Sequence, residues 1–239
     1  LSKKYPEYRW NKNFGYGTKM HFRATDREGT FDLDVTLNMP GAHNVLNALA
    51  AITVANQLGV SESVIAHGLE HFQGVGRRFQ IVGTLAGNSG KILIVDDYAH
   101  HPREIAATLS AARGSWPGRR LVVVFQPHRY TRTRDLFDDF TLVLPEADVL
   151  LILGVYPAGE QSLKGADSRD LCRAIRNRGK LEPLFVERKD QVRAILGDLI
   201  VADDVIMILG AGDIGNLPDE LVSSGIGSFE NFCPWEWQQ

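Results

Sequence analysis

From about Asp97 onward, strand-like apolar runs alternate with segments of helical periodicity, and a first apolar run lies just before this point. The runs lack polar alternation, which is typical of parallel strands buried on both faces. The pattern therefore predicts a doubly wound α/β domain with a mostly parallel sheet. The predicted strands are Ile92–Val95, Leu121–Phe125, Val149–Leu153, Leu184–Val186 and Val205–Leu209, and the predicted helices are Pro102–Ala112, Thr133–Val143, Ser168–Asn177 and Lys189–Leu199.

The first third of the chain has a different pattern. Two segments in which apolar and polar residues alternate flank the turn sequence of residues 26–29, which is a β-hairpin signature. Two helical segments follow, so we predict an α+β unit over residues 1–80 and the α/β domain over 81–239. The elements predicted in the first unit are strands over Lys19–Thr25 and Thr30–Leu37 and helices over Asn44–Leu58 and Ser61–Phe72.

Composition excludes several classes of protein. Hydrophobic residues make up 44% of the 239 positions, so a sizeable core can form. The formal net charge is -3 with no basic block, which does not suggest nucleic-acid binding. No apolar run is long enough to span a bilayer, and no signal peptide is visible. Cys172 and Cys233 lack metal or redox spacing, which favours reduced thiols in a cytoplasmic protein. Because the sequence begins at Leu1, we expect a piece of a longer protein.

The first candidate site follows the strand that ends near Val95. Asp97, Tyr98 and His100 come where that strand gives way to a helix, the corner at which α/β sheets bind ligands. A carboxylate there can bind a ribose hydroxyl, and a histidine can contact a phosphate or an amine. The alternative is a turn in which the aspartate caps the helix and the histidine packs beneath it.

A second cluster follows the next strand along the chain, and we expect the two strand ends to be adjacent. Arg129 and Arg132 present planar donors that match the oxygens of carboxylates or phosphates. A solvated helix start is the alternative. The helix macrodipole disfavours cations at an N-terminus, so an anionic ligand explains the two arginines better.

Three further residues are candidates with strong alternatives. Asn44 and Asn47 share one helix face, and side-chain amides suit an adenine edge, although an N-cap and a solvated Asn explain the spacing better. Arg78 lies at the predicted domain junction, where it can reach a nucleotide phosphate. A linker salt bridge is equally compatible with its position.

Three motifs are interpreted as structural. Residues 210–215, Gly-Ala-Gly-Asp-Ile-Gly, match a dinucleotide fingerprint, but no further strand follows with the required acid, so we expect a close packing turn rather than an NAD site. Residues 87–91 are too short for a phosphate loop. His67 and His71 have helical metal-pair spacing without a third ligand nearby in sequence, so no metal site is predicted.

Taken together, these residues resemble the Mur ligases of bacterial cell-wall synthesis. The segment FQPHRYTRTRDLF resembles most specifically the member that joins L-alanine to UDP-N-acetylmuramate. The related murein peptide ligase has a similar AHHP corner. The segments that carry the resemblance are GAHNVLNALAA (41–51), GVGRRFQ (74–80), VDDYAHHPREIAATL (95–109), VVVFQPHRYTRTRDLFDDF (122–140), YPAGE (156–160) and ILGAGDIG (208–215).

The resemblance implies an ATP-dependent amide ligation through an acyl phosphate, in peptidoglycan synthesis. The partners it implies are UDP-N-acetylmuramate and L-alanine, with ATP and Mg²⁺. It also implies that residues 1–80 are the end of a central ATP-binding domain and that 81–239 are a Rossmann-like amino-acid-binding domain. The family's phosphate loop and Mg²⁺ ligands are absent from this sequence, so we expect the chain alone to be inactive.

The nucleotide contacts that the resemblance implies come from four positions. Asn44 and Asn47 would meet adenine, Arg78 the phosphates and Asp97 the ribose. For the amino acid and the transferring phosphate, His100, Arg129 and Arg132 would act as binding and catalytic residues. Tyr98 would shape the small amino-acid pocket.

Two other functions stay open. The parent could be the related murein peptide ligase, which acts on a peptide rather than on alanine. Alternatively, the chain could be a non-catalytic domain that binds a nucleotide or a partner protein. The sequence does not indicate an oligomeric state.

Overall fold

The structure is a computed structural model that describes residues 9–13, 18–26, 30–87 and 90–231. These residues divide into two compact units, each with its own hydrophobic core. Unit 1 contains the chain up to Val75 together with residues 110–117, and unit 2 contains residues 76–109 and the chain from Gly118 onward. The assignment of unit 1 to the end of an ATP-binding domain stays a prediction.

Unit 1 is a three-stranded antiparallel sheet with two helices. The predicted hairpin is confirmed, with Phe22 opposite Val35, while residues 27–29 of its predicted turn lie outside the described residues. A further strand, in a stretch without a clear hydrophobic pattern, pairs with the hairpin. Alternate hairpin residues are buried, including Phe22, Leu33 and Val35. The elements are β1 (Arg9–Asn13), β2 (Met20–Thr25), β3 (Asp32–Leu37), α1 (Ala42–Gln57) and α2 (Glu62–Glu70).

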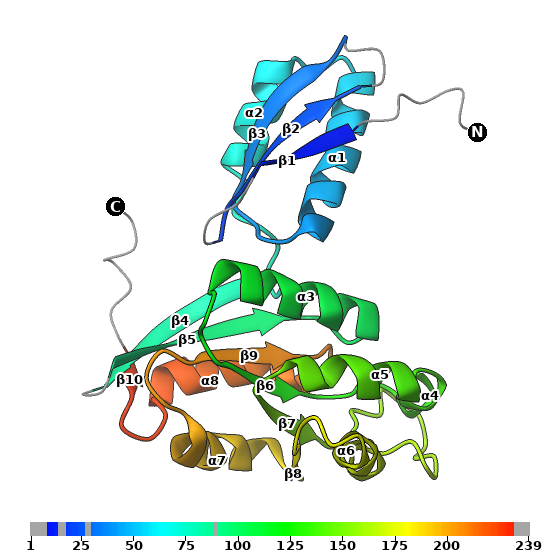
Figure 1. Cartoon of the computed structure of the whole chain (residues 1–239), viewed down its shortest axis with the longest axis vertical. Coiled ribbons are helices and arrows are strands. Elements are labelled where there is room, and N and C mark those ends of the chain that lie inside the picture. The colour runs from blue at the N-terminus through cyan, green and yellow to red at the C-terminus, as the bar shows by residue number, and fades with distance from the viewer. Residues whose placement is uncertain (1–8, 14–17, 27–29, 88–89, 232–239) are drawn as a thin grey trace. The chain divides into compact units, whose positions relative to one another are not determined.

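Unit 2 is built on a seven-stranded sheet, with strand order β10-β4-β5-β9-β6-β7-β8 (Figure 1). The five strands from β5 to β8 in this order are parallel, and β4 and β10 form an antiparallel edge. The mostly parallel α/β fold expected from the apolar runs is therefore confirmed. The strands are β4 (Gln80–Gly87), β5 (Gly90–Asp97), β6 (Leu121–Phe125), β7 (Val149–Leu153), β8 (Leu184–Val186), β9 (Val205–Leu209) and β10 (Glu230–Asn231).

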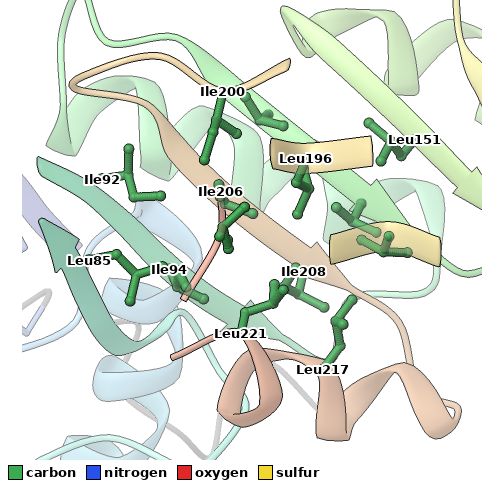
Figure 2. Packing of buried hydrophobic residues seen from close by; sticks show 14 of the residues in the cluster. Leu85, Ile92, Ile94, Leu151, Leu196, Ile200, Ile206, Ile208, Leu217 and Leu221 are labelled. Carbon is green, nitrogen blue, oxygen red and sulfur yellow. The ribbon is translucent and has the colours of Figure 1, made fainter. Parts of the chain in front are cut away.

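Helices pack against the sheet of unit 2. On one face, Leu196, Leu217 and Leu221 converge on the central strand residues Ile206 and Ile208 (Figure 2). Residues of the parallel strands that lie between these positions are also buried, as expected for a sheet covered on both sides. The helices are α3 (Pro102–Ser115), α4 (Tyr130–Asp135), α5 (Phe137–Val143), α6 (Ser168–Asn177), α7 (Val192–Leu199) and α8 (Leu217–Ser224), with short 3₁₀ turns η1 (Leu144–Glu146), η2 (Lys189–Gln191) and η3 (Asp213–Asn216).

Several elements of the structure, among them β1, β4, α8 and β10, were not predicted, and one predicted helix is divided. Strand β4 was not predicted, because it is only partly buried and contains Gly83, where a Cβ would lie 2.8 Å from Val222 Cγ2. The predicted helix over Thr133–Val143 is two helices, because the backbone breaks at Leu136 (φ -116°, ψ 21°).

Candidate active site

The polar residues singled out in unit 2 gather at the carboxyl ends of its parallel strands. One expectation is wrong: the ends of β5 and β6 are not adjacent, because β9 lies between them. Two strand spacings amount to about 10 Å. The His100 and His128 rings nevertheless have their centroids 5.7 Å apart, so side chains from the loops that follow β5 and β6 approach each other. The crevice outside strand ends is the usual ligand site of such sheets.

Glycines in the loop that follows β9 permit close approaches from its neighbours. At Gly212, a Cβ would lie 2.6 Å from both Gln126 Oε1 and Tyr156 Cγ. At Gly215, a Cβ would lie 2.5 Å from the guanidinium carbon of Arg77. Gln126 is bonded to this loop, donating to Asp213 Oδ1 (2.7 Å) and accepting from the Ile214 N–H (3.2 Å). The close packing of neighbouring side chains therefore explains why glycine occupies positions 212 and 215.

Asp97 is anchored inside the protein. Its carboxylate accepts hydrogen bonds from the backbone N–H of Phe79 (2.9 Å), the N–H of Ala99 (2.8 Å) and the Thr108 hydroxyl (3.3 Å). The residue is 5% exposed. Burial raises the pKa of this carboxyl, against the opposing effect of the donated hydrogen bonds. This geometry fits the alternative of a structural turn, and a contact of Asp97 with ribose stays a prediction.

His100 is oriented by its own loop and by α3. Its Nδ1 lies 2.9 Å from the Tyr98 carbonyl oxygen, which can only accept, so Nδ1 carries the proton in this contact. Glu104 accepts the backbone N–H of His100 (3.0 Å) and lies 3.5 Å from its Nδ1. Burial acts to raise the pKa of Glu104, but the backbone N–H groups of His100 and His101 and the charge of Arg78 hold it below its usual value. In the neutral ring, Nε2 is then the acceptor that His100 can offer to a ligand.

Two arginines lie over the ring of Tyr98. The guanidinium carbons of Arg77 and Arg78 are 5.1 and 5.4 Å from the ring centroid, within the range of cation–π contacts. The Arg78 side chain is 45% exposed and lies 4.0 Å from Glu104. Its guanidinium is therefore accessible to an anion.

Arg77 faces the protein instead. Its Nε donates to Asp96 Oδ2 (2.9 Å) and its Nη2 to the Gly210 carbonyl (2.7 Å). Its carbonyl accepts the Tyr98 N–H (2.7 Å), and Arg77 and Phe79 both have positive φ (58° and 50°). Such strained backbone persists only where its surroundings hold it. This segment is thereby fixed to the end of β5, and Arg78 with it.

Asp96 is almost fully buried, at 3% exposed. Burial raises the pKa of its carboxyl, and the hydrogen bond from Arg77 opposes this effect. Among the described residues its Oδ1 has no hydrogen-bond partner. The ion pair with Arg77 is therefore the contact that compensates its burial.

The loop after β6 carries His128, Arg129 and Arg132. Arg132 Nη1 lies 3.3 Å from His128 Nδ1 and 3.3 Å from the His128 carbonyl. The His128 ring stacks on Tyr156, with centroids 5.4 Å apart and 15° between the planes. Burial lowers the pKa of His128, and the charge of Arg132 lowers it further. A neutral His128 accepts the hydrogen bond from Arg132 through Nδ1.

The predicted adenine-binding residues lie in unit 1, on α1. Asn44 is buried and its Nδ2 donates to the Pro40 carbonyl (2.8 Å), which fixes the start of the helix. Asn47 is exposed, and its Nδ2 lies 3.4 Å from Asn44 Oδ1. The N-cap of α1 is Gly41 rather than Asn44, so the N-cap alternative is wrong for Asn44, and the adenine role of both residues stays a prediction.

Within the described residues, no group of three or more His, Cys, Asp or Glu side chains could hold a metal ion. His67 and His71 stack with ring centroids 4.0 Å apart and lie on an exposed surface. The residues present in this part of the chain thus do not fit the Mg²⁺ that the resemblance implies. In the same residues, no helix is long and apolar enough to cross a membrane.

Three residues of this site lie in the sequence motifs, but the sequence indicates no role for them. Arg77 precedes Arg78, His128 precedes Arg129, and Glu160 ends the YPAGE segment. Glu160 could have been noticed, because it follows the predicted strand at Val149–Leu153 and strand ends of one sheet share an edge. Nothing in the sequence distinguishes Arg77 from Arg78, since their difference comes from backbone conformation.

The fold and the cationic strand ends define a ligand-binding α/β domain of the type that ligases use. Residues 77–212, more than half of the chain, match the model of a protein family described as Mur ligase, glutamate ligase domain. The chain belongs to the Mur ligase family. These proteins are ATP-dependent amide ligases of the peptidoglycan peptide ligase superfamily.

Solved structures agree with this membership. The chain is 29% identical to UDP-N-acetylmuramate-alanine ligase from Thermotoga maritima, with a TM-score of 0.73, over 91% of this chain and 45% of that one. It is 25% identical to a murein peptide ligase from Psychrobacter arcticus, with a TM-score of 0.61, over 91% and 44%. Folylpolyglutamate synthase from Thermotoga maritima, 19% identical with a TM-score of 0.58 over 91% and 47%, shares the fold. The chain thus spans less than half the length of these proteins.

Proposed function

We propose that this chain is part of an enzyme that ligates L-alanine to UDP-N-acetylmuramate through an acyl phosphate at the expense of ATP. The observation that carries the proposal is the convergence of His100, His128 and Arg132 at the strand ends of unit 2. The similarity to an alanine ligase at 29% identity supports it. Because Mur ligases act in cell-wall precursor synthesis, we place the enzyme in the cytoplasm.

The proposed ligation requires cations near its anionic reactants and a correctly oriented amine. An amino acid brings one carboxylate, which a planar guanidinium such as that of Arg132 can bind through two hydrogen bonds. His100 offers Nε2 as an acceptor for an amine N–H, because its Nδ1 donates to the Tyr98 carbonyl. Arg78, exposed beside Tyr98, offers positive charge to phosphate oxygens. These groups stabilise negative charge that develops during phosphoryl and acyl transfer.

ATP and Mg²⁺ supply the activation of the carboxylate in this family. The described residues contain no metal cluster, so no step is assigned to a metal bound by this chain. The sequence also lacks a G-x-x-x-x-G-K-[ST] loop. We therefore expect the isolated chain to be inactive, and turnover of ATP, L-alanine and UDP-N-acetylmuramate by it would contradict this expectation.

The test is amino-acid-dependent phosphate release by the full-length enzyme. With UDP-N-acetylmuramate and ATP present, L-alanine should stimulate release. Substituting Arg132→Ala should raise the KM for L-alanine by about 10- to 150-fold, since a hydrogen bond to a charged group contributes about 1.5–3 kcal/mol, and should change the KM for ATP far less. Equal increases in both constants would indicate a structural role for Arg132.

The second candidate is the murein peptide ligase activity, which the 25% identity to the Psychrobacter arcticus enzyme favours. It would join a peptide rather than L-alanine to UDP-N-acetylmuramate. Phosphate release that depends on a murein tripeptide, and not on L-alanine, would support this candidate and exclude the first.

A further inference from the structure

Glu160, in the loop after β7, binds the start of helix α4. Its Oε1 accepts the Thr131 hydroxyl (2.7 Å) and its Oε2 accepts the Thr131 backbone N–H (3.0 Å). The first N–H groups of a helix have no partner within the helix. The residue at the N-cap position, Arg129, makes no side-chain capping bond. Glu160 therefore caps α4 from a different loop.

The two loops involved are also joined through their backbones. The Tyr156 N–H donates to the Pro127 carbonyl (2.8 Å), and the Arg129 N–H donates to the Tyr156 carbonyl (2.8 Å). The stacking of His128 on Tyr156 adds a side-chain contact. These backbone hydrogen bonds and the ring contact between the two loops thus set the position of Glu160 relative to α4.

The two arginines of this cluster have different surroundings. Arg129 Nη1 lies 3.9 Å from Glu160 Oε1. Arg132 contacts the ring and carbonyl of His128, and no carboxylate among the described residues forms an ion pair with it. A ligand carboxylate that approached Arg129 would be repelled by the negative charge of Glu160. A ligand carboxylate at Arg132 would have no protein carboxylate among the described residues within ion-pair distance of that arginine.

We propose that Glu160 is a positioning residue that engages Arg129 and the start of α4, and so leaves Arg132 as the arginine that binds the carboxylate of the amino acid. This inference rests on the function proposed above and assigns its two arginines different roles. Arg129 orders the loop, and Arg132 contacts the substrate. The charge of Glu160 also compensates that of Arg129 before a ligand binds.

The surroundings of His128 give a readout of this arrangement. Burial, Arg132, His100 and Arg129 lower the pKa of His128, in that order, and Glu160 opposes them. Tyr156 covers one face of the ring. Removing the charge of Glu160 should therefore lower the pKa of His128 further, an effect that a merely structural glutamate outside the cluster would not produce.

The first experiment uses this chain and NMR pH titration of its histidine rings. Glu160→Gln and Glu160→Ala should both move the His128 titration to lower pH. The control Glu182→Ala, which removes an exposed partner of Arg176, should leave it unchanged. Glu160→Ala should also lower the melting temperature more than Glu160→Gln, because glutamine can still accept from the Thr131 N–H. An unshifted His128 titration in Glu160→Gln overturns the proposed link.

The second experiment compares the arginines in the full-length enzyme with saturating ATP. Arg132→Ala should raise the KM for L-alanine at least about tenfold, and Arg129→Ala by no more than about threefold. Equal increases would refute the division of roles between them. If the wild-type enzyme releases no phosphate with L-alanine, the proposed function fails, while the His128 titration still decides whether Glu160 acts on the cluster.

Discussion

Substituting Gly212 tests whether the loop after β9 needs glycine so that side chains from the neighbouring loops can pack closely against it. Its φ of -88° suits any residue, so Gly212→Ala introduces no backbone strain. The new Cβ would lie 2.6 Å from Gln126 Oε1 and 2.6 Å from Tyr156 Cγ, whereas real Cβ atoms essentially never come within 3.0 Å of another group. Gln126, after β6, and Tyr156, in the loop after β7, must therefore move away from residue 212.

Overpacking of this kind costs about 1–3 kcal/mol of the free energy of unfolding. For a chain of this size, each kcal/mol lowers the melting temperature by about 2–4 °C, so a decrease of about 2–12 °C is expected. Urea and thermal denaturation followed by circular dichroism measure both quantities. The NMR signals of His128 should also shift, because its ring stacks on Tyr156.

The matched control for this substitution is Gly114→Ala in α3. No atom lies within 4 Å of the position of its Cβ, and alanine is favoured over glycine in a helix by up to about 1 kcal/mol. Gly114→Ala should therefore be neutral or stabilising. If Gly212→Ala is as stable as the wild type and leaves the His128 signals unmoved, the loop does not need glycine there and our packing argument is wrong.

Two further predictions concern buried carboxylates. Because burial raises the pKa of Asp97 above its ordinary value of 3.8 in the folded state, its contribution to stability is fully present below that value and is lost as the pH rises through the folded pKa. Asp97→Asn should therefore destabilise most at acidic pH and progressively less toward neutral pH in urea titrations, and a constant difference would contradict this. Asp204 is fully buried and accepts hydrogen bonds from Arg120 at both oxygens (2.9 and 2.7 Å). Because Arg120 is partly exposed and can regain water, Asp204→Ala should lower the free energy of unfolding by about 1–3 kcal/mol. Asp190→Ala, in an exposed pair, should change the unfolding curve little, and equal effects of the two substitutions would refute the role of burial.

The parallel strands of unit 2 could be predicted because each is an apolar run, and apolar runs are visible in the sequence. The order of the strands could not. Strand β9 comes last of the parallel strands along the chain, yet it lies between β5 and β6. That insertion depends on contacts between residues far apart in sequence, such as Val123 with Met207, and no local pattern encodes it.

The same division holds for the candidate site. That Asp97 lies at a strand end and Arg129 follows one could be predicted from the sequence, since each comes after an apolar run. Their hydrogen-bond partners could not, because Phe79 and Thr108 reach Asp97 from other segments and Glu160 reaches Arg129 from the loop after β7. A sequence motif therefore indicates where a polar side chain lies, while its partners decide whether it is available to a ligand.

The choice of substrate in this fold must depend on those strand-end side chains, because a folylpolyglutamate synthase shares the same architecture. The other arginines named at the site already have a carboxylate near them: Arg77 has Asp96, Arg78 has Glu104, and Arg129 has Glu160. Arg132 has only neutral partners among the described residues. A ligand with a single carboxylate gains most by binding where positive charge is not yet compensated. We therefore propose that the arrangement of acids in unit 2 directs the carboxylate of a small amino acid to Arg132.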